Sequence, residues 1–150
     1  MKILDQLRAG VMTASAAETR RLGARFAAVL APDATLALHG DLGVGKTTFV
    51  QGLAQGFGFD GPVTSPTFNI LHLYRPGPAA GAAPRLLLHL DAYRLEQAHD
   101  LAELMLEDFL VSPYCLAVEW PDRIAAWLPP GTLHLTLGIA APGRHRVALA

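Results

Sequence analysis

Residues 40–47, Gly-Asp-Leu-Gly-Val-Gly-Lys-Thr, carry the clearest chemistry in the chain. They match G-x-x-x-x-G-K-[ST], in which glycines let consecutive backbone N–H groups converge on phosphate oxygens. Lys46 would reach the β- and γ-phosphates, and the Thr47 hydroxyl suits a Mg²⁺ ion. Lys46 is also one of only two lysines in the sequence. The pattern predicts a site for a nucleoside triphosphate.

Two acidic residues end apolar runs and are candidates for the metal end of this site. Asp91 closes residues 86–91 and Glu119 closes residues 115–119. A carboxylate there holds Mg²⁺, directly or through water, or orients the attacking water, and the residues alone leave these roles open. His89 shares a strand face with Asp91, and we interpret it as a hydrogen-bonded polar residue rather than a zinc ligand. Trp120 by itself favours a core position, with a role beside the site as the alternative.

The elements that must position these residues follow from hydrophobic spacing. The apolar run 35–39 predicts a buried strand before the loop, and Phe49, Val50, Leu53 and Phe57 predict a helix over 47–57 after it. The capping box Ser15 to Glu18 predicts an earlier helix to about residue 30. It would bury Leu22, Phe26, Val29 and Leu30. Residues 96–110 have an amphipathic helical pattern, whole or broken in two. Further strands are expected at 11–13, 68–74, 86–90, 114–118, 133–139 and 144–149.

These elements predict one α/β domain over residues 1–150, a three-layer sandwich like that of P-loop NTPases. Two hairpins, 68–90 and 133–149, make its central sheet mixed, with parallel and antiparallel pairs. Residues 76–84 are rich in proline, glycine and alanine and are expected to be a mobile hairpin tip. Residues 1–10 show no clear element, so disorder is one alternative for them.

The composition of the sequence narrows the class of protein that it can encode. The sequence has 51% hydrophobic residues and a net charge of −1, so no general charge favours nucleic acid. The single Cys115 excludes an internal disulfide, and no apolar stretch is long enough to span a membrane, so a cytoplasmic protein is expected. Asn69 is the only asparagine, so the guanine motif N-K-x-D is absent. The loop around Thr67 occupies the place of a nucleotide-sensing switch segment.

Four motifs in this order resemble the bacterial TsaE family, also called YjeE. They are residues 40–48, then Ser65-Pro-Thr-Phe68, then Leu90-Asp-Ala-Tyr-Arg-Leu95, then Val118-Glu-Trp-Pro121. The resemblance covers residues 11–149. TsaE proteins are small P-loop ATPases needed to make threonylcarbamoyladenosine in tRNA.

The resemblance implies a role for each matching residue. Thr47 and Glu119 would hold Mg²⁺, Asp91 would be the essential second carboxylate, acting on water or on the metal, and Thr67 would belong to the switch loop. Trp120 would work beside the site. The resemblance implies that ATP or ADP binds at Gly40, Asp41, Leu42, Gly43, Val44, Gly45, Lys46, Thr47 and Thr48, with its base flanked by Thr13, Ala16, Gly143 and Arg144.

The family also implies partners. TsaE-like proteins act on a complex of TsaB and TsaD, so tRNA would be met only indirectly. No arginine finger stands out, although Arg94, Arg123 and Arg144 are candidates, which predicts slow turnover alone and faster turnover with partners. Two alternatives stay open: a small-molecule kinase, and a nucleotide-binding module without meaningful hydrolysis. The oligomeric state is left open as well.

Overall fold

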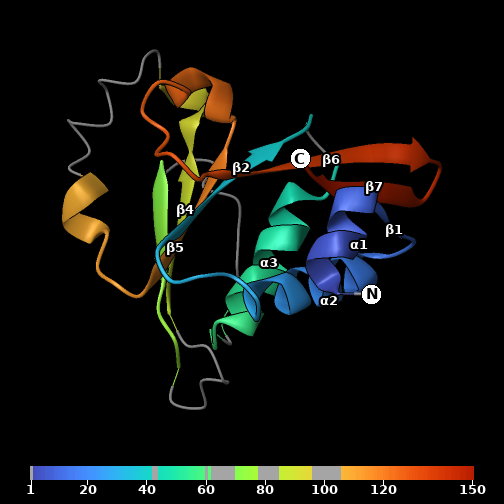
Figure 1. The fold of residues 1–150 in the computed structure, drawn as a ribbon, viewed down its shortest axis with the longest axis horizontal. Coiled ribbons are helices and arrows are strands. Elements are labelled where there is room, and N and C mark those ends of the chain that lie inside the picture. The colour runs from blue at the N-terminus through green and yellow to red at the C-terminus, as the bar shows by residue number, and fades with distance from the viewer. Residues whose placement is uncertain (1, 42–43, 60, 62–69, 78–84, 96–105) are drawn as a thin grey trace.

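The computed structural model describes residues 2–41, 44–59, 61, 70–77, 85–95 and 106–150. Seven strands of these described ranges form one sheet in the order β1-β7-β6-β2-β5-β4-β3 (Figure 1). The four central strands β6, β2, β5 and β4 are parallel, whereas β3, β7 and β1 join by antiparallel pairing. The strands are Val11–Thr13, Ala34–His39, Leu71–Tyr74, Leu86–Asp91, Tyr114–Glu119, Leu133–Ala141 and Arg144–Leu149, numbered β1 to β7. The predicted mixed sheet and α/β architecture are confirmed.

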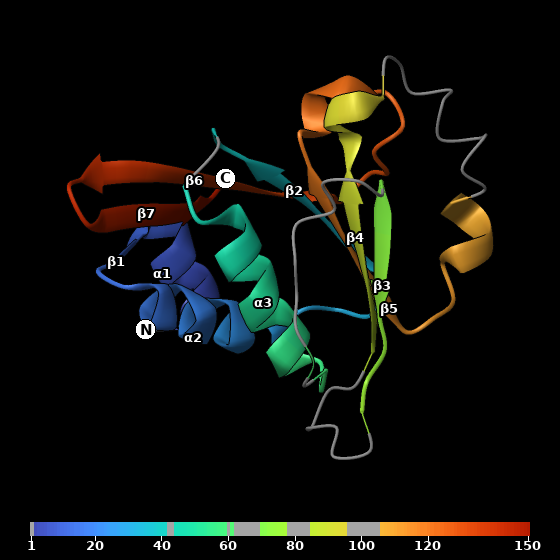
Figure 2. The ribbon, with the colours of Figure 1, turned by 180° about the vertical axis from the view of Figure 1, so that it is seen from behind.

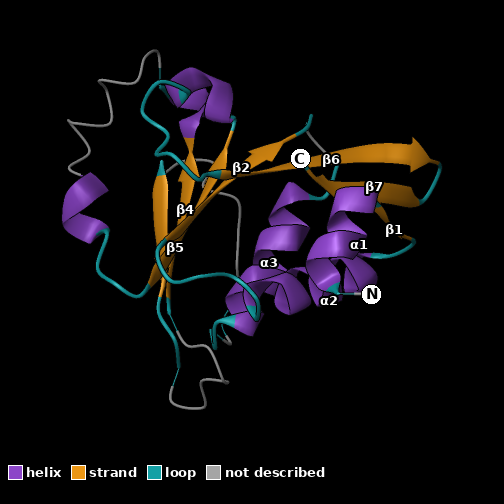
Figure 3. Ribbon diagram, in the orientation of Figure 1, coloured by secondary structure: helices purple, strands orange, loops and turns teal. Residues whose placement is uncertain are grey.

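In the described part of the chain, three helices pack on one face of this sheet (Figure 3). They are α1 (Ile3–Ala9), α2 (Ala16–Ala27) and α3 (Lys46–Gly56). α2 begins with the predicted capping box, because the Ser15 hydroxyl accepts a hydrogen bond from the Glu18 N–H at 3.1 Å. The side chains that meet the sheet include Phe26, Phe49 and Leu53, all with no exposed surface. This core holds α3 against the strand that leads into it.

α2 and α3 approach each other so closely that only glycine fits at their contact. A Cβ atom on Gly23 would lie 2.5 Å from the carbonyl oxygen of Phe49, and one on Gly52 would lie 2.9 Å from the carbonyl carbon of Arg20. A second brace joins the far ends of these helices to β4. The Arg85 guanidinium donates to the carbonyls of Leu30 and Ala31 and lies 4.8 Å from the ring centre of Phe57.

Short 3₁₀ segments and loops cover the other face of β4 and β5 (Figure 2). They are η1 (Ala92–Arg94), η2 (Leu106–Phe109) and η3 (Pro121–Ile124). Leu88, Leu90, Leu116 and Val118 of the strands form a second core with Leu106 and Ile124. Strands β4 and β5 are therefore buried on both faces, as their unbroken apolar runs predict.

The structure corrects some expectations. Residues 1–10 contain helix α1, whose Ile3 and Leu7 are buried against the core, so disorder was the wrong alternative for this segment. Val29 is 46% exposed because α2 ends at Ala27 and the chain turns there. The alternating apolar residues of 133–139 predict a half-buried strand with Ile139 on its buried face, but Ile139 is 62% exposed because β6 runs on past the end of β2, whose last pair is His39 with Thr136.

Other expectations fall on residues that the structure leaves undescribed. The amphipathic pattern 96–110 is described only from residue 106, where η2 is a 3₁₀ segment and Phe109 is 39% exposed. The expected hairpin tip is described only at Pro76 and Gly77, and the Gly77 N–H donates to the Gly58 carbonyl at 2.9 Å. Among the described residues, no helix is long and apolar enough to span a membrane.

Candidate functional site

The site lies where the parallel strands β2, β4 and β5 end at one edge of the sheet. Asp91, the last residue of β4, is paired with Glu119, the last residue of β5, and Glu119 is paired in turn with Leu38 of β2. Alternation along the strands puts both carboxylates on the α3 side of the sheet, the side on which Leu87 and Ala117 pack. The register thus brings the two predicted acids together beside the phosphate loop, at the edge where ligands of such sheets bind.

The described part of the phosphate loop has the backbone geometry that its glycines predict. Gly40 has φ of +144°, and a Cβ there would collide with the carbonyl oxygen of Leu137. Gly45 is left-handed at φ +98° and is the N-cap of α3, which has no side-chain cap. Among the described residues, a Cβ on Gly45 would meet no atom within 4 Å. A helix that begins at a left-handed glycine with no side-chain cap is an arrangement that suits an anion. Leu42 and Gly43 lie outside the described residues.

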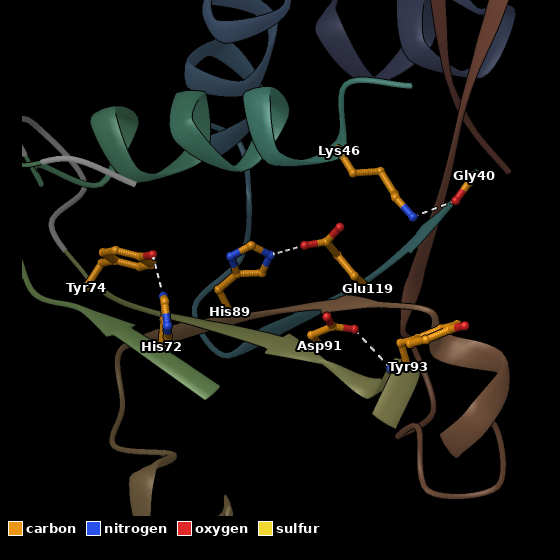
Figure 4. A network of polar contacts seen from close by, with 8 residues as sticks. All are labelled: Gly40, Lys46, His72, Tyr74, His89, Asp91, Tyr93 and Glu119. Atoms are coloured by element: carbon orange, nitrogen blue, oxygen red, sulfur yellow. Dashed lines mark hydrogen bonds and ion pairs between the residues drawn. The ribbon is translucent and has the colours of Figure 1, made fainter. Parts of the chain in front are cut away.

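Lys46 is buried at the start of α3 and is 5% exposed. Its ammonium group donates to the Gly40 carbonyl at 2.5 Å and lies 4.2 Å from the centre of the Trp120 ring (Figure 4). Burial lowers the pKa of Lys46 from its usual value, and the negative charges of Glu119, Asp91 and Asp41 oppose that shift. A cation held against a carbonyl and an aromatic face, with acids nearby, is suited to exchange these contacts for phosphate oxygens.

Glu119 is 6% exposed and hydrogen-bonded to a histidine that sequence reasoning did not connect with it. His89 Nε2 lies 2.5 Å from Glu119 Oε2, and His89 has no exposed surface. We expected His89 to be hydrogen-bonded, but its spacing pointed to Asp91 on the same strand. The contact runs diagonally between β4 and β5, since His89 is paired with Ala117. Only the register between the two strands reveals it.

Asp91 has a different environment. Its carboxylate accepts a hydrogen bond from the Tyr93 N–H at 2.9 Å and caps η1. The Tyr93 ring lies 5.2 Å from the Trp120 ring, and the Arg123 guanidinium lies 5.5 Å from the centre of the Tyr93 ring. Tyr93, which is 54% exposed, is a further residue at the site that sequence reasoning did not select.

Trp120 follows Glu119 in the left-handed conformation, with φ of 56° and ψ of 53°. A bulky residue in this region costs about 1 kcal/mol or more, so the surrounding structure must hold it there. This turn directs the indole back over Lys46 instead of into the core. Trp120 therefore lies over Lys46, whereas its sequence context alone favoured a core position.

The remaining predicted residues divide into three groups. Thr47 and Thr48 lie in the first turn of α3. Thr13, whose hydroxyl is 2.7 Å from that of Thr19, is paired with His145 on β7. This pairing puts Thr13 beside the Gly143–Arg144 turn, and Ala16 begins the following helix. Thr67 and the side chain of Arg94 lie outside the described residues.

A pocket of about 560 Å³ borders the phosphate loop. It is lined by residues of three segments: His39 to Asp41 with Val44, Trp120 to Asp122, and Leu137 to Ile139. His39, which lines this pocket, stacks on His134, and its Nε2 lies 2.9 Å from His134 Nδ1. Burial is the main cause that lowers the pKa of His39.

The donor set fits a phosphate-bound Mg²⁺ ion better than a metal held by protein alone. Among the described residues, no cluster of three or more histidine, cysteine or acidic side chains could hold a metal ion. Mg²⁺ usually takes one or two carboxylates and completes its shell with water and substrate phosphates. Glu119, Asp91 and the Thr47 hydroxyl, beside an uncapped helix start, match that requirement.

Comparison with known proteins places this geometry in a family. The family model described as "Threonylcarbamoyl adenosine biosynthesis protein TsaE" matches residues 13–146. A protein of Treponema pallidum (strain Nichols), named tRNA threonylcarbamoyladenosine biosynthesis protein TsaE, is 32% identical over 91% of this chain and 96% of its own. A protein of the same name from Streptomyces coelicolor is 43% identical over 79% of this chain and 77% of its own.

A solved structure gives the same result. The crystal structure of YdiB from Bacillus subtilis superposes with a TM-score of 0.71 at 31% identity, covering 92% of this chain and 81% of that one. The matched region includes the phosphate loop, both strand-end carboxylates and Trp120. The chain belongs to the TsaE family.

Proposed function

We propose that this protein is a Mg²⁺-dependent ATPase that serves threonylcarbamoyladenosine modification of tRNA by acting on a complex of TsaB and TsaD. The observation that carries the ATPase proposal is the convergence of three charged groups from three elements. Lys46 begins α3 behind a glycine-rich turn, and Asp91 and Glu119 are paired at the ends of β4 and β5. The pathway is supported by the names of the family and of its curated members.

Each group has a role that its position supports. The N–H groups of the loop and of the first turn of α3 would bind phosphate oxygens, and Lys46 would leave Gly40 to join them. Thr47 and Glu119 would hold Mg²⁺, which offsets negative charge on the β- and γ-phosphates. Asp91, which is less buried than Glu119, would orient the attacking water. Trp120 would close over Lys46 and the phosphates.

The partner dependence rests on what the site lacks. No arginine among the described residues forms an ion pair with Asp91 or Glu119, and the Arg123 guanidinium lies over Tyr93. In some NTPases a partner protein supplies a positive charge that stabilises the phosphoryl-transfer transition state and raises the rate of hydrolysis by several orders of magnitude. We therefore expect slow ATP hydrolysis by the protein alone and faster hydrolysis with TsaB and TsaD. tRNA would be met only through that complex, in the cytoplasm.

Calorimetry and phosphate release test the proposal. ATP and ADP should bind the purified protein, and Lys46→Ala should weaken binding by about 10- to 100-fold because a charged hydrogen-bond donor is lost. Asp91→Ala should retain nucleotide binding and lose hydrolysis, and Gln55→Ala, at an exposed position of α3, should behave as the parent.

Three outcomes would count against the proposal. Absence of nucleotide binding, with or without TsaB and TsaD, would remove its basis. A hydrolysis rate unchanged by the partners would contradict the accessory role. Transfer of phosphate to a metabolite, in place of release as inorganic phosphate, would favour a kinase.

A further inference from the structure

We propose that His89 is the positioning residue for the carboxylate of Glu119, and that it sets how strongly the site takes up Mg²⁺. The inference rests on the proposed function, because it assigns a second residue to the same metal site. It is carried by the hydrogen bond between His89 Nε2 and Glu119 Oε2, which joins two buried side chains.

The contact fixes one oxygen of the carboxylate. A glutamate at a strand end rotates about three side-chain bonds. If that rotation must be frozen when the metal binds, the affinity of the site for the metal falls. The N–H of His89 holds Oε2 in place, and Figure 4 shows the second oxygen turned toward the side on which Lys46 lies. That second oxygen is thus left to meet a cation.

Within the described ranges, Glu119 is the hydrogen-bond partner of the His89 ring. His89 is fully buried, and its Nδ1 atom has no hydrogen-bond partner among the described residues. An ionised carboxylate can only accept, so in this contact the Nε2–H of His89 donates to Glu119 Oε2. Ala117, paired with His89 across the strands, is small enough to let the imidazole lie alongside and reach Glu119. Burying the polar imidazole costs free energy. A leucine at this position would avoid that cost if the side chain only filled space.

Among the described residues, no side chain holds the second acid in this way. The Asp91 carboxylate accepts from the Tyr93 backbone, which belongs to its own turn. The two carboxylates therefore differ in environment: Glu119 is buried and oriented by a side chain, and Asp91 is partly exposed and held by a backbone N–H. Loss of His89 should therefore weaken metal binding by Glu119 and leave the role proposed for Asp91 largely unchanged.

The test uses two variants of His89 and a matched control. His89→Leu removes the donor and keeps an apolar volume, whereas His89→Gln keeps an N–H near the position of Nε2. His72→Leu is the control, because His72 is paired with His89 on the adjacent strand β3 and its ring contacts Tyr74 instead of Glu119. Calorimetry measures ADP affinity for each protein at increasing Mg²⁺ concentration.

The expected result separates metal uptake from nucleotide binding. ADP affinity without metal should stay within about twofold of the parent value in all variants. In His89→Leu, the Mg²⁺ concentration that gives half of the full Mg²⁺ effect on ADP affinity should rise about 10- to 100-fold. His89→Gln should recover most of this loss, and His72→Leu should match the parent. An unchanged Mg²⁺ response in folded His89→Leu would overturn the inference, as would equal loss of metal-free ADP binding.

A spectroscopic readout needs neither metal nor nucleotide. In ¹⁵N-labelled protein, the Nε2–H proton of His89 should resonate at low field and lose that position in Glu119→Ala but not in His72→Leu. An Nε2–H signal indifferent to Glu119→Ala overturns the inference even if His89→Leu fails to fold. Failure of the parent protein to bind ADP would instead defeat the proposed function, so the two failures are distinguishable.

Discussion

Gly52→Ala tests how tightly α3, the helix that begins with Lys46, is held against α2. Alanine in a helix interior gains about 1 kcal/mol over glycine from propensity alone. Here the added Cβ would collide with the carbonyl oxygen of Arg20 and lie 2.9 Å from its carbonyl carbon, where ordinary contacts begin at 3.4 Å. The obstacle is backbone of the facing helix, so overpacking should cost about 2–3 kcal/mol, toward the upper end of its usual range. The net effect is a free energy of unfolding lowered by about 1–2 kcal/mol.

Urea unfolding measures this loss, and ADP titration measures its functional consequence. Because α3 must shift away from α2, the first turn that carries Lys46 should shift as well, and ADP affinity should fall in protein that remains folded. Gln55→Ala, an exposed residue of the same helix, is the control and should change the free energy of unfolding by less than about 0.5 kcal/mol. If Gly52→Ala is as stable as the parent or more so, the argument from close helix contact is wrong.

Three further predictions follow from buried polar groups. Arg85→Lys should lower the free energy of unfolding by about 1–3 kcal/mol in urea, because an ammonium cannot reproduce the two-carbonyl contact and the stacking on Phe57. Burial lowers the pKa of Lys46 in the folded protein, so its charge opposes folding near neutral pH and this cost fades as pH rises through that pKa. Lys46→Met should therefore be more stable than the parent in nucleotide-free urea unfolding near neutral pH, with a smaller difference at alkaline pH; equal stability at both would contradict the assignment. Burial raises the pKa of the Cys115 thiol to about 12, so alkylation should be limited by unfolding, and rapid labelling of folded protein would count against its burial.

The described backbone around Gly40, Gly45 and Lys46 agrees with the motif because its requirements are local, while phosphate binding there stays a prediction. Local backbone angles require glycine at positions 40 and 45, and the local need for a positive charge requires lysine at position 46. The strand before the loop and the helix after it follow from apolar spacing, and both lie within one residue of the expected bounds. The two acids are also predictable, since parallel strands end at one edge.

The parts that could not be predicted depend on register and on neighbours. The His89–Glu119 contact crosses two strands diagonally, and no spacing within either strand encodes it. The left-handed turn at Trp120 is a strained conformation that residue type argues against. Helix α1 is only seven residues long and depends on packing against β7, so its Ile3 and Leu7 gave too short a pattern.

The strand order has a consequence for how the protein is made. Strand β2 leaves the ribosome early, but its two neighbours in the sheet are β5 and β6, which come late in the chain. Until those segments emerge, both edges of β2 lack their native partners while α2 and α3 are already available. The nascent chain must therefore keep an apolar strand from pairing wrongly for most of its translation, which makes chaperone protection most valuable before Tyr114 appears.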